Sequence, residues 1–328
     1  MNSIELLSDL VADQYGTHVV QLEPLHRFAS AERGIFRVER ATQPPWLLRA
    51  YRQEPGEDRW LVQRAATLLY LEQRGYPAPR LVHTRQGEMV GRQHGWATLM
   101  LTFVKGTVDE QTGAFDAIGA ALARLHTVDV RTATSTTPPV PFARWQPQQQ
   151  IFDWIAALHA LAGQIPAELD GVYRFTLESL QRVVQWPPLP AAILHTDCWV
   201  QNAVQTIEGE IVLIDWDGAG LGPPLLDLGY LLVACHAFLP EWPQFRPNRN
   251  RIHAVLAGYS AVRPLTASER EHLADAVGFA EAFRMAQVLP AALAGDWRQQ
   301  RNLTRFYARY PVTTEIARLA GDYLAHSQ

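Results

Sequence analysis

The sequence has few of the residues on which several common functions depend. It contains two cysteines, Cys198 and Cys235, and no Cys-x-x-Cys pair or Cys/His cluster with zinc spacing, so neither a disulfide framework nor a zinc centre is expected. No apolar run reaches the roughly 18 residues of a membrane span. The first residues, MNSIELLSDL, carry acids and no basic segment, which argues against a signal peptide. These absences predict a cytoplasmic protein in a reducing compartment, without a membrane partner.

Lysine is nearly absent. Of the 29 basic Lys and Arg residues only Lys105 is a lysine, so no function that needs a lysine can use another position. The formal net charge of −4 predicts no basic face for nucleic acid. Apolar residues make up 48% of the chain, which is enough for a large core and excludes a disordered chain. A length of 328 residues suits two lobes better than one core.

The hydrophobic pattern is mixed strand and helix over the first hundred residues and becomes mostly helical from Ala114 onward. Short runs of β-branched and aromatic residues between turn residues predict strands over 19–22, 35–39, 46–51, 80–84 and 97–103. Apolar residues at helical spacing predict helices over 4–14, 58–74, 114–127, 149–161 and 167–185. We therefore expect an α+β fold with two domains, 1–103 and 104–328, joined by a hinge at about 101–106.

The segment that carries chemistry runs from Leu194 to Gly229. Asp197 and Asn202 lie in a short predicted loop between strands, and Asp215 follows the next hairpin within Ile-Asp-Trp-Asp. Carboxylate and amide oxygens suit Mg²⁺, whose shell substrate phosphates can complete. A remaining carboxylate can orient or deprotonate a hydroxyl. One acid alone would be read as a turn residue, but this combination is typical of phosphoryl transfer from a nucleotide.

These motifs resemble the catalytic and metal loops of the aminoglycoside phosphotransferase and choline kinase-like family, which shares the protein-kinase fold. The looser similarities are a glycine-containing hairpin at 28–38, the strand at 46–51, Val-Lys-Gly at 104–106 and Leu-Ala-Arg-Leu-His at 122–126. The resemblance implies a bilobal fold, with a small antiparallel sheet and one long helix in the N-lobe and a larger helical C-lobe. It also implies ATP (or GTP), Mg²⁺, and transfer of phosphate to a hydroxyl of a small molecule.

The resemblance also implies roles for single residues. Asp197 would be the catalytic base that orients the acceptor hydroxyl, and Asn202 and Asp215 would hold Mg²⁺. Three further residues would support these loops without reacting: His195, Asp217 and Asp227. Cys198, inside the catalytic loop, is expected to be a packing residue.

The N-lobe departs from the family pattern. Kinases bind the α- and β-phosphates with a lysine on the third strand, paired to a helix glutamate. Here that strand carries Arg49, which keeps the charge and can bind phosphate through two N–H groups. Helix register puts Gln63 or Arg64 where the glutamate is expected, and Gln63 could serve as a neutral hydrogen-bonding partner.

The hairpin at 28–38, which would cover the nucleotide phosphates, holds a single glycine, Gly34, and no Gly-x-Gly-x-x-Gly sequence. The chain also lacks the Gly-x4-Gly-Lys-Ser/Thr motif of P-loop proteins. Met100 would line the adenine pocket, although an apolar core explains it equally well. The expected nucleotide-binding residues are Arg49, Ser30, Gly34, Met100, Leu101 and Phe103, with Gln63 in support.

The acceptor pocket is expected to come from the chain after Gly229. Residues 230–328 carry eleven arginines and eight acids, which mildly disfavours a polycationic aminoglycoside. An antibiotic of another kind, an amino alcohol or an amino acid such as homoserine remains open. So does a bacterial protein Ser/Thr kinase, or a catalytically impaired pseudokinase that binds nucleotide. The protein would act as a monomer or homodimer.

Overall fold

The protein is described here from a computed structural model, which covers residues 3–17, 19–25, 33–52, 59–108, 114–130, 147–236 and 246–326. These residues fall into two compact units. The described residues of the first unit lie within Met1–Thr107 and Thr206–Asp217, and those of the second within 108–130, 147–205 and 218–326. No helix in these ranges is long and apolar enough to cross a membrane.

The first unit is built on an antiparallel sheet with the strand order β1-β2-β3-β5-β4. Its strands are β1 (Val19–Pro24), β2 (Arg33–Arg40), β3 (Trp46–Arg52), β4 (Gly91–Gln93) and β5 (Trp96–Thr102). The register of β3 on β5 pairs Leu48 with Met100 and Arg49 with Leu99. Because alternate side chains of a strand point to opposite faces, Leu48 and Arg49 serve different faces of the sheet.

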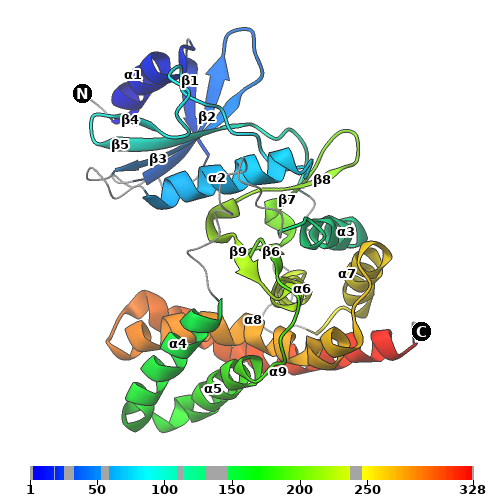
Figure 1. Cartoon of the computed structure of the whole chain (residues 1–328). Coiled ribbons are helices and arrows are strands. Elements are labelled where there is room, and N and C mark those ends of the chain that lie inside the picture. Colours follow the sequence, from blue (N-terminus) through cyan, green and yellow to red (C-terminus); the bar gives the residue numbers. More distant parts are fainter. Residues whose placement is uncertain are drawn as a thin grey trace. The chain divides into compact units, whose positions relative to one another are not determined.

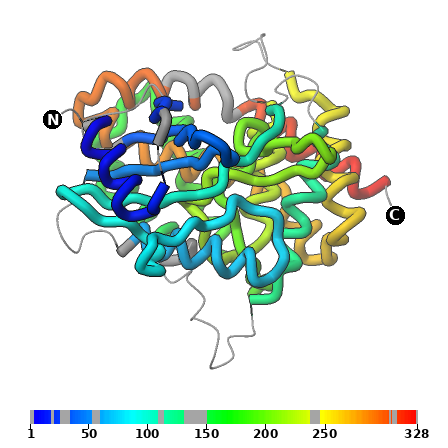
Figure 2. Tube along the Cα trace, turned by 90° about the horizontal axis from the view of Figure 1, so that it is seen from above, coloured from blue at the N-terminus to red at the C-terminus, as the bar shows by residue number. Residues whose placement is uncertain are grey.

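A helix covers each face of this sheet (Figure 1). Helix α1 (Ser3–Tyr15) packs on the face that carries Leu48 and Met100, and these side chains share one buried cluster with it. Figure 2 shows α1, in dark blue, crossing over the strands. Helix α2 (Arg59–Gln73) packs on the Arg49 face, where the Tyr51 ring meets Trp60 edge-on at 4.5 Å. The sheet thus buries apolar groups on one face and a charged side chain on the other.

The second unit is mostly helical and includes the short strands β6 (Ala192–Leu194), β7 (Ala203–Gln205) and β9 (Gly220–Gly222). Strand β6 pairs antiparallel with β9. The helices are α3 (Phe115–His126), α4 (Pro147–Leu161), α5 (Asp170–Val184), α6 (Pro224–Ala234), α7 (Arg249–Val262), α8 (Ala267–Leu293) and α9 (Trp297–His326). A capping box, in which Thr266 and Glu269 exchange side-chain and backbone hydrogen bonds, starts α8.

Helices α3 and α7 approach closely because each has a glycine at the crossing. A Cβ on Gly258 would lie 1.8 Å from the carbonyl oxygen of Asp116, and a Cβ on Gly119 would lie 2.3 Å from that of Val255. Any larger residue would force the helices apart. This contact fixes α3, whose last residue, His126, lies beside the loop described below.

The fold agrees with the α+β kinase-like architecture expected from the sequence. One expected strand, 80–84, is wrong: only Leu81 makes a bridge, to Leu101. The segment makes backbone-to-backbone hydrogen bonds to β5 only through the Arg80 carbonyl and the Val82 N–H, because the chain turns at Thr84, whose backbone bonds to Gly87 and Glu88 instead. Strand β4 was not predicted, because it has only three residues.

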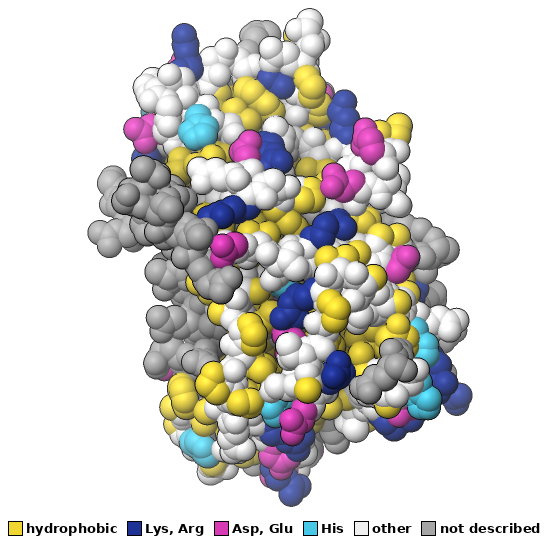
Figure 3. Space-filling view, turned by 45° about the vertical axis from the view of Figure 1, so that its right-hand side comes forward, with side chains coloured by type: hydrophobic (Ala, Val, Ile, Leu, Met, Phe, Trp, Pro, Cys, Tyr) yellow, Lys and Arg dark blue, Asp and Glu magenta, His cyan; other side chains and the backbone are white. Residues whose placement is uncertain are grey.

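The face of the molecule drawn in Figure 3 carries acidic and basic side chains interspersed with apolar ones. Among the described residues on this face there is no continuous basic surface of the kind that binds a nucleic-acid backbone.

Candidate active site

The loop after β6 is held by a buried carboxylate of α6. Asp227 is 1% exposed. Its Oδ2 accepts the backbone N–H of His195 at 2.6 Å, and its Oδ1 accepts that of Thr196 at 2.8 Å. Thr196 has φ 67°, which is unusual for a β-branched residue. These two charge-assisted hydrogen bonds therefore stabilise a strained backbone.

His126 of α3 completes this buried group. Its Nε2 lies 3.3 Å from Asp227 Oδ2 and its Nδ1 lies 2.8 Å from the Tyr259 hydroxyl. Burial lowers the pKa of His126 even though Asp227 opposes this shift, so the ring is neutral. Since an ionised carboxylate can only accept, Nε2 carries the proton and Nδ1 accepts from Tyr259.

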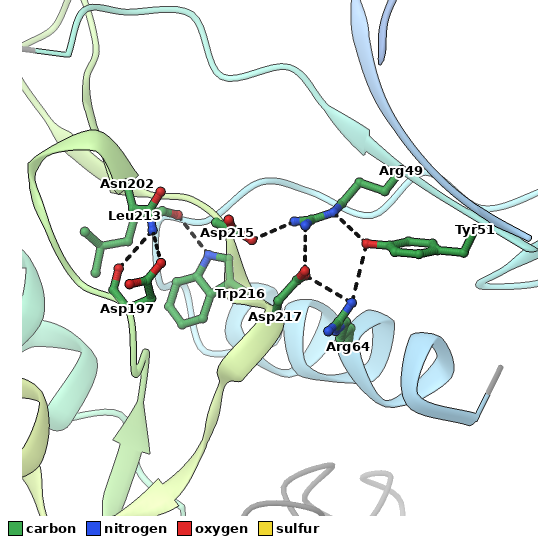
Figure 4. A network of polar contacts seen from close by, with 9 residues as sticks. All are labelled: Arg49, Tyr51, Arg64, Asp197, Asn202, Leu213, Asp215, Trp216 and Asp217. Carbon is green, nitrogen blue, oxygen red and sulfur yellow. Dashed lines mark hydrogen bonds and ion pairs between the residues drawn. The ribbon is translucent and has the colours of Figure 1, made fainter. Parts of the chain in front are cut away.

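Asp197 lies in the loop that Asp227 holds. The Asn202 Nδ2 donates to Asp197 Oδ2 at 2.8 Å and to its carbonyl oxygen at 2.9 Å (Figure 4). The Tyr230 hydroxyl of α6 donates to the other carboxylate oxygen, and Arg284 of α8 in turn donates to the Tyr230 oxygen. The Asp197 side chain is nevertheless 44% exposed. It is a carboxylate fixed in orientation but open to solvent, as a general base requires.

Tyr230 and Arg284 are the site residues that the sequence did not single out. Burial raises the pKa of Tyr230, although the Arg284 charge opposes the shift, so the phenol remains a donor. The Arg284 guanidinium lies 4.7 Å from the centre of the Tyr230 ring and 3.9 Å from Asp197 Oδ1. No sequence motif marks either residue, since both are brought to Asp197 by the packing of α6 on α8.

A cavity of about 180 Å³ lies in the second unit beside this loop. Aromatic side chains line much of it, and two glutamines add polar groups. The lining residues are Gln150, Trp154, Leu194, Thr196, Leu226, Asp227, Tyr230, Phe279, Phe283 and Gln287. Its volume is below the ~300–1,000 Å³ usual for drug-sized ligands.

In the first unit, Arg49 is the centre of a second polar group (Figure 4). Its side chain is 9% exposed, and its three nitrogens have three acceptors. Nη1 donates to Asp215 Oδ1 at 2.9 Å, Nη2 to Asp217 Oδ2 at 2.6 Å, and Nε to the Tyr51 hydroxyl at 3.1 Å. Burial alone would lower the Arg49 pKa, but Asp217 and the other partners raise it. Arg49 is therefore not a solvated charge at a strand edge.

The chain turns sharply at Asp215, which has φ 63°. After it, the indole N–H of Trp216 donates to the Leu213 carbonyl at 2.8 Å, and the buried Trp216 ring meets Tyr76 edge-on at 5.8 Å. These contacts hold the short segment that presents Asp215 and Asp217 to Arg49. The Trp216 ring serves packing.

The other predicted nucleotide residues lie in or beside the sheet. Met100 is fully buried in the cluster under α1, which is the core role left open by the sequence. A Cβ on Gly34 would lie 2.4 Å from the Phe36 ring, so a larger residue here would require that ring to move. The Phe103 N–H donates to the Pro45 carbonyl at 3.3 Å.

Three remaining predicted residues are placed as follows. Leu101 is buried in β5. Gln63 lies in α2, where its carbonyl accepts from Thr67 at 3.0 Å. Ser30 lies outside the described residues.

A magnesium ion would need oxygen ligands, and the candidate residues Asn202 and Asp215 both carry them. Within the described ranges no group of three or more His, Cys, Asp or Glu side chains is placed to hold a metal ion. Mg²⁺ in nucleotide sites takes only one or two protein ligands, with waters and phosphates. Asn202 directs its Nδ2 at Asp197, so its Oδ1 is the end that suits a hard cation. In the first unit, Asp215 has a carboxylate side chain that is 40% exposed.

Cys198 lies inside the packed loop. It is fully buried, and burial raises the pKa of its thiol well above the usual value, with Asp227 and Asp197 adding to the shift. It therefore stays a protonated packing residue, as the sequence suggested.

Comparison with curated sequences finds homoserine kinases. The enzyme of Beijerinckia indica subsp. indica is 31% identical over 211 residues, which cover 61% of this chain and 60% of that protein. The enzyme of Xanthobacter autotrophicus is 28% identical over 274 residues, covering 81% and 80%. The first of these matches thus spans less than two thirds of the relative's own length.

Solved structures show the same fold. A structure of amicoumacin kinase has a TM-score of 0.69 at 18% identity and covers 97% of this chain and 94% of that one. A choline/ethanolamine kinase family protein from Mesorhizobium loti has a TM-score of 0.60 at 19% identity, covering 93% and 92%. The sequence also matches the phosphotransferase enzyme family over residues 25–265. The resemblance seen in the motifs is confirmed, and the chain belongs to the phosphotransferase enzyme family.

Proposed function

We propose that this protein is an ATP- and Mg²⁺-dependent phosphotransferase that transfers the γ-phosphate to a hydroxyl of a small molecule in the cytoplasm. Asp197 orients the acceptor hydroxyl and takes its proton. Asn202 and Asp215 hold the metal ion, which when bound neutralises charge on the phosphates. Arg49 contacts the nucleotide phosphates in place of the usual lysine.

The observation that carries this proposal is the state of Asp197. Its carboxylate accepts from Asn202 and Tyr230, yet close to half of the side chain is exposed. An acid in a simple turn needs neither partner. An acid that positions a reacting hydroxyl needs a fixed orientation and open access, because phosphoryl transfer depends mainly on positioning.

The second unit also favours one class of acceptor. The cavity is small, and Arg284 brings positive charge next to Asp197 through Tyr230. We propose a compact acceptor with a carboxylate, that is, an amino acid with a side-chain hydroxyl. The homoserine kinases among the relatives support this choice. A polycationic aminoglycoside would meet the positive charge of Arg284 at Asp197 and is larger than the cavity.

The test measures ADP release with ATP, Mg²⁺ and a panel of L-homoserine, ethanolamine, choline and spectinomycin. We expect L-homoserine to stimulate release most strongly. Asp197→Asn should lower kcat at least ~100-fold, which is the usual effect of removing a general base. The matched control is Asp170→Asn, which breaks only an exposed pair with Arg174 and should change kcat less than twofold. Release that survives Asp197→Asn, or no release with any acceptor, would refute the proposal.

A second function is favoured by the contact between Arg49 and Asp215. An arginine that binds the proposed metal ligand at 2.9 Å fits a pseudokinase that binds nucleotide without turnover. This alternative predicts that ADP raises the melting temperature by mass action, while no acceptor gives ADP release that depends on Asp197. A protein Ser/Thr kinase would instead show autophosphorylation that Asp197→Asn abolishes.

A further inference from the structure

The carboxylate of Asp217 joins two arginines that come from different elements of the first unit. Its Oδ2 binds Arg49 of β3 at 2.6 Å, and its Oδ1 binds Arg64 of α2 at 3.2 Å. In Figure 4 the carboxylate lies between the two guanidinium groups. The Tyr51 hydroxyl accepts from both arginines, from Arg49 at 3.1 Å and from Arg64 at 3.5 Å.

This arrangement places two like charges in a largely buried environment. A guanidinium can be buried only when it is paired and hydrogen-bonded, and repulsion between two of them adds to that cost. The bridging carboxylate offsets both effects. Arg64 is also held from the side, because its guanidinium lies 4.0 Å from the Trp60 ring centre. Each of the three charged groups is therefore confined to one orientation.

Kinases confine their phosphate-binding cation with a glutamate on the N-lobe helix. Here α2 carries Gln63 and Arg64 at the corresponding register instead of an acid, and its one glutamate, Glu72, lies at the other end of the helix. We infer that Asp217 takes over the task of this glutamate. It positions Arg49 for the nucleotide phosphates, and Arg64 ties α2 to the same carboxylate. This inference rests on the proposed function and gives Asp217 a positioning role.

Arg49 in β3 and Asp217 therefore act as a pair. A guanidinium has a fork of donors, so Arg49 can bind Asp215 and Asp217 through separate nitrogens at once. A lysine ammonium, a point charge, has no such fork. The same arrangement explains the basic residue on α2. The Asp217 carboxylate can accept a second guanidinium, that of Arg64, whereas it would repel a glutamate at this position of the helix.

The test compares nucleotide affinity among variants, with ADP as the probe and equilibrium binding as the measurement. Asp217→Asn keeps the shape but removes the charge, and we expect it to weaken ADP binding at least tenfold. The KM for ATP should rise similarly, while the KM for the acceptor changes less than twofold. The control is Asp322→Asn, which breaks an exposed contact with Arg318 of the same 2.6 Å length and should leave ADP affinity unchanged.

A rescue experiment distinguishes a positioning role of Asp217 from a purely structural one. In the double variant Asp217→Asn/Arg64→Glu the carboxylate returns from α2, as in ordinary kinases, and ADP affinity should recover to within threefold of wild type. Melting temperatures identify any variant that fails to fold, and Asp217→Glu then provides the conservative comparison, with expected affinity near wild type.

Unchanged ADP affinity in Asp217→Asn would overturn the inference. So would a loss that Arg64→Glu does not restore, because the carboxylate would then act only from its own position. ADP binding needs no acceptor, so the inference can fail while phosphotransfer stands. It can also hold if no acceptor is ever found.

Discussion

Replacing Asp227 should both destabilise the protein and impair catalysis, because one buried carboxylate holds the backbone of the Asp197 loop. In Asp227→Ala the N–H groups of His195 and Thr196 lose acceptors at 2.6 and 2.8 Å. Hydrogen bonds to charged groups contribute roughly 1.5–3 kcal/mol each, so we expect a loss of about 3–6 kcal/mol. Asp227→Asn keeps one acceptor oxygen and should lose about half as much. This loss is a large fraction of the roughly 5–15 kcal/mol by which a typical protein is stable.

The assay is urea unfolding followed by tryptophan fluorescence, combined with kcat at a temperature where each variant is folded. Asp116→Ala is the matched control, since Asp116 is also an acid in the first turn of a helix but is exposed. It should change the free energy of unfolding by less than ~0.5 kcal/mol. The reasoning would be refuted if Asp227→Ala unfolded within about 1 kcal/mol of wild type. It would also be refuted if kcat of the folded Asp227→Asn variant were unchanged, because Thr196 would then keep its left-handed backbone without the carboxylate.

Two further predictions concern stability. Gly258→Ala should destabilise by about 2–3 kcal/mol, because its Cβ would lie 1.8 Å from the Asp116 carbonyl. Gly321→Ala, in an exposed part of α9 with nothing within 4 Å, should stabilise by about 0.5–1 kcal/mol; equal effects in urea unfolding would contradict the helix contact. Burial lowers the pKa of His236 to about 4, so the unfolded chain, with the ordinary value near 6.5, takes up its proton first as pH falls. Stability present above pH 6.5 should therefore drop by about 2 kcal/mol at pH 5, and a His236→Gln variant as pH-dependent as wild type would disprove this.

The sequence predicted the fold because its signals are local. A short apolar and aromatic run between turn residues marks β3, and helical spacing marks α3, within ten or so residues of chain. The candidate catalytic motif was equally visible, since Asp197 and Asn202 lie five residues apart. Its recognition needed residue types and spacing but no knowledge of packing.

Contacts between distant segments of the chain could not be predicted from such local patterns. Tyr230 lies three residues after Asp227, but no motif includes it. Arg284 is 54 residues from Tyr230, and nothing near it in the chain marks it as a neighbour of Asp197. Likewise, helix register placed Gln63 or Arg64 opposite Arg49, but a second arginine was not expected to pair with a basic residue of the same charge. The acid that makes it acceptable, Asp217, belongs to a segment that packs with the first unit although it follows much of the second.

The guanidinium in β3 also has a chemical consequence. Arginine does not acylate under conditions in which a lysine amine does, because it stays protonated, and the Arg49 pKa is raised further by its acidic neighbours. Nucleotide reagents that label kinases through a phosphate-binding amine should leave this position unmodified. The exposed Lys105 is the sole lysine they could mark, so amine-directed profiling would not label the proposed nucleotide site at Arg49.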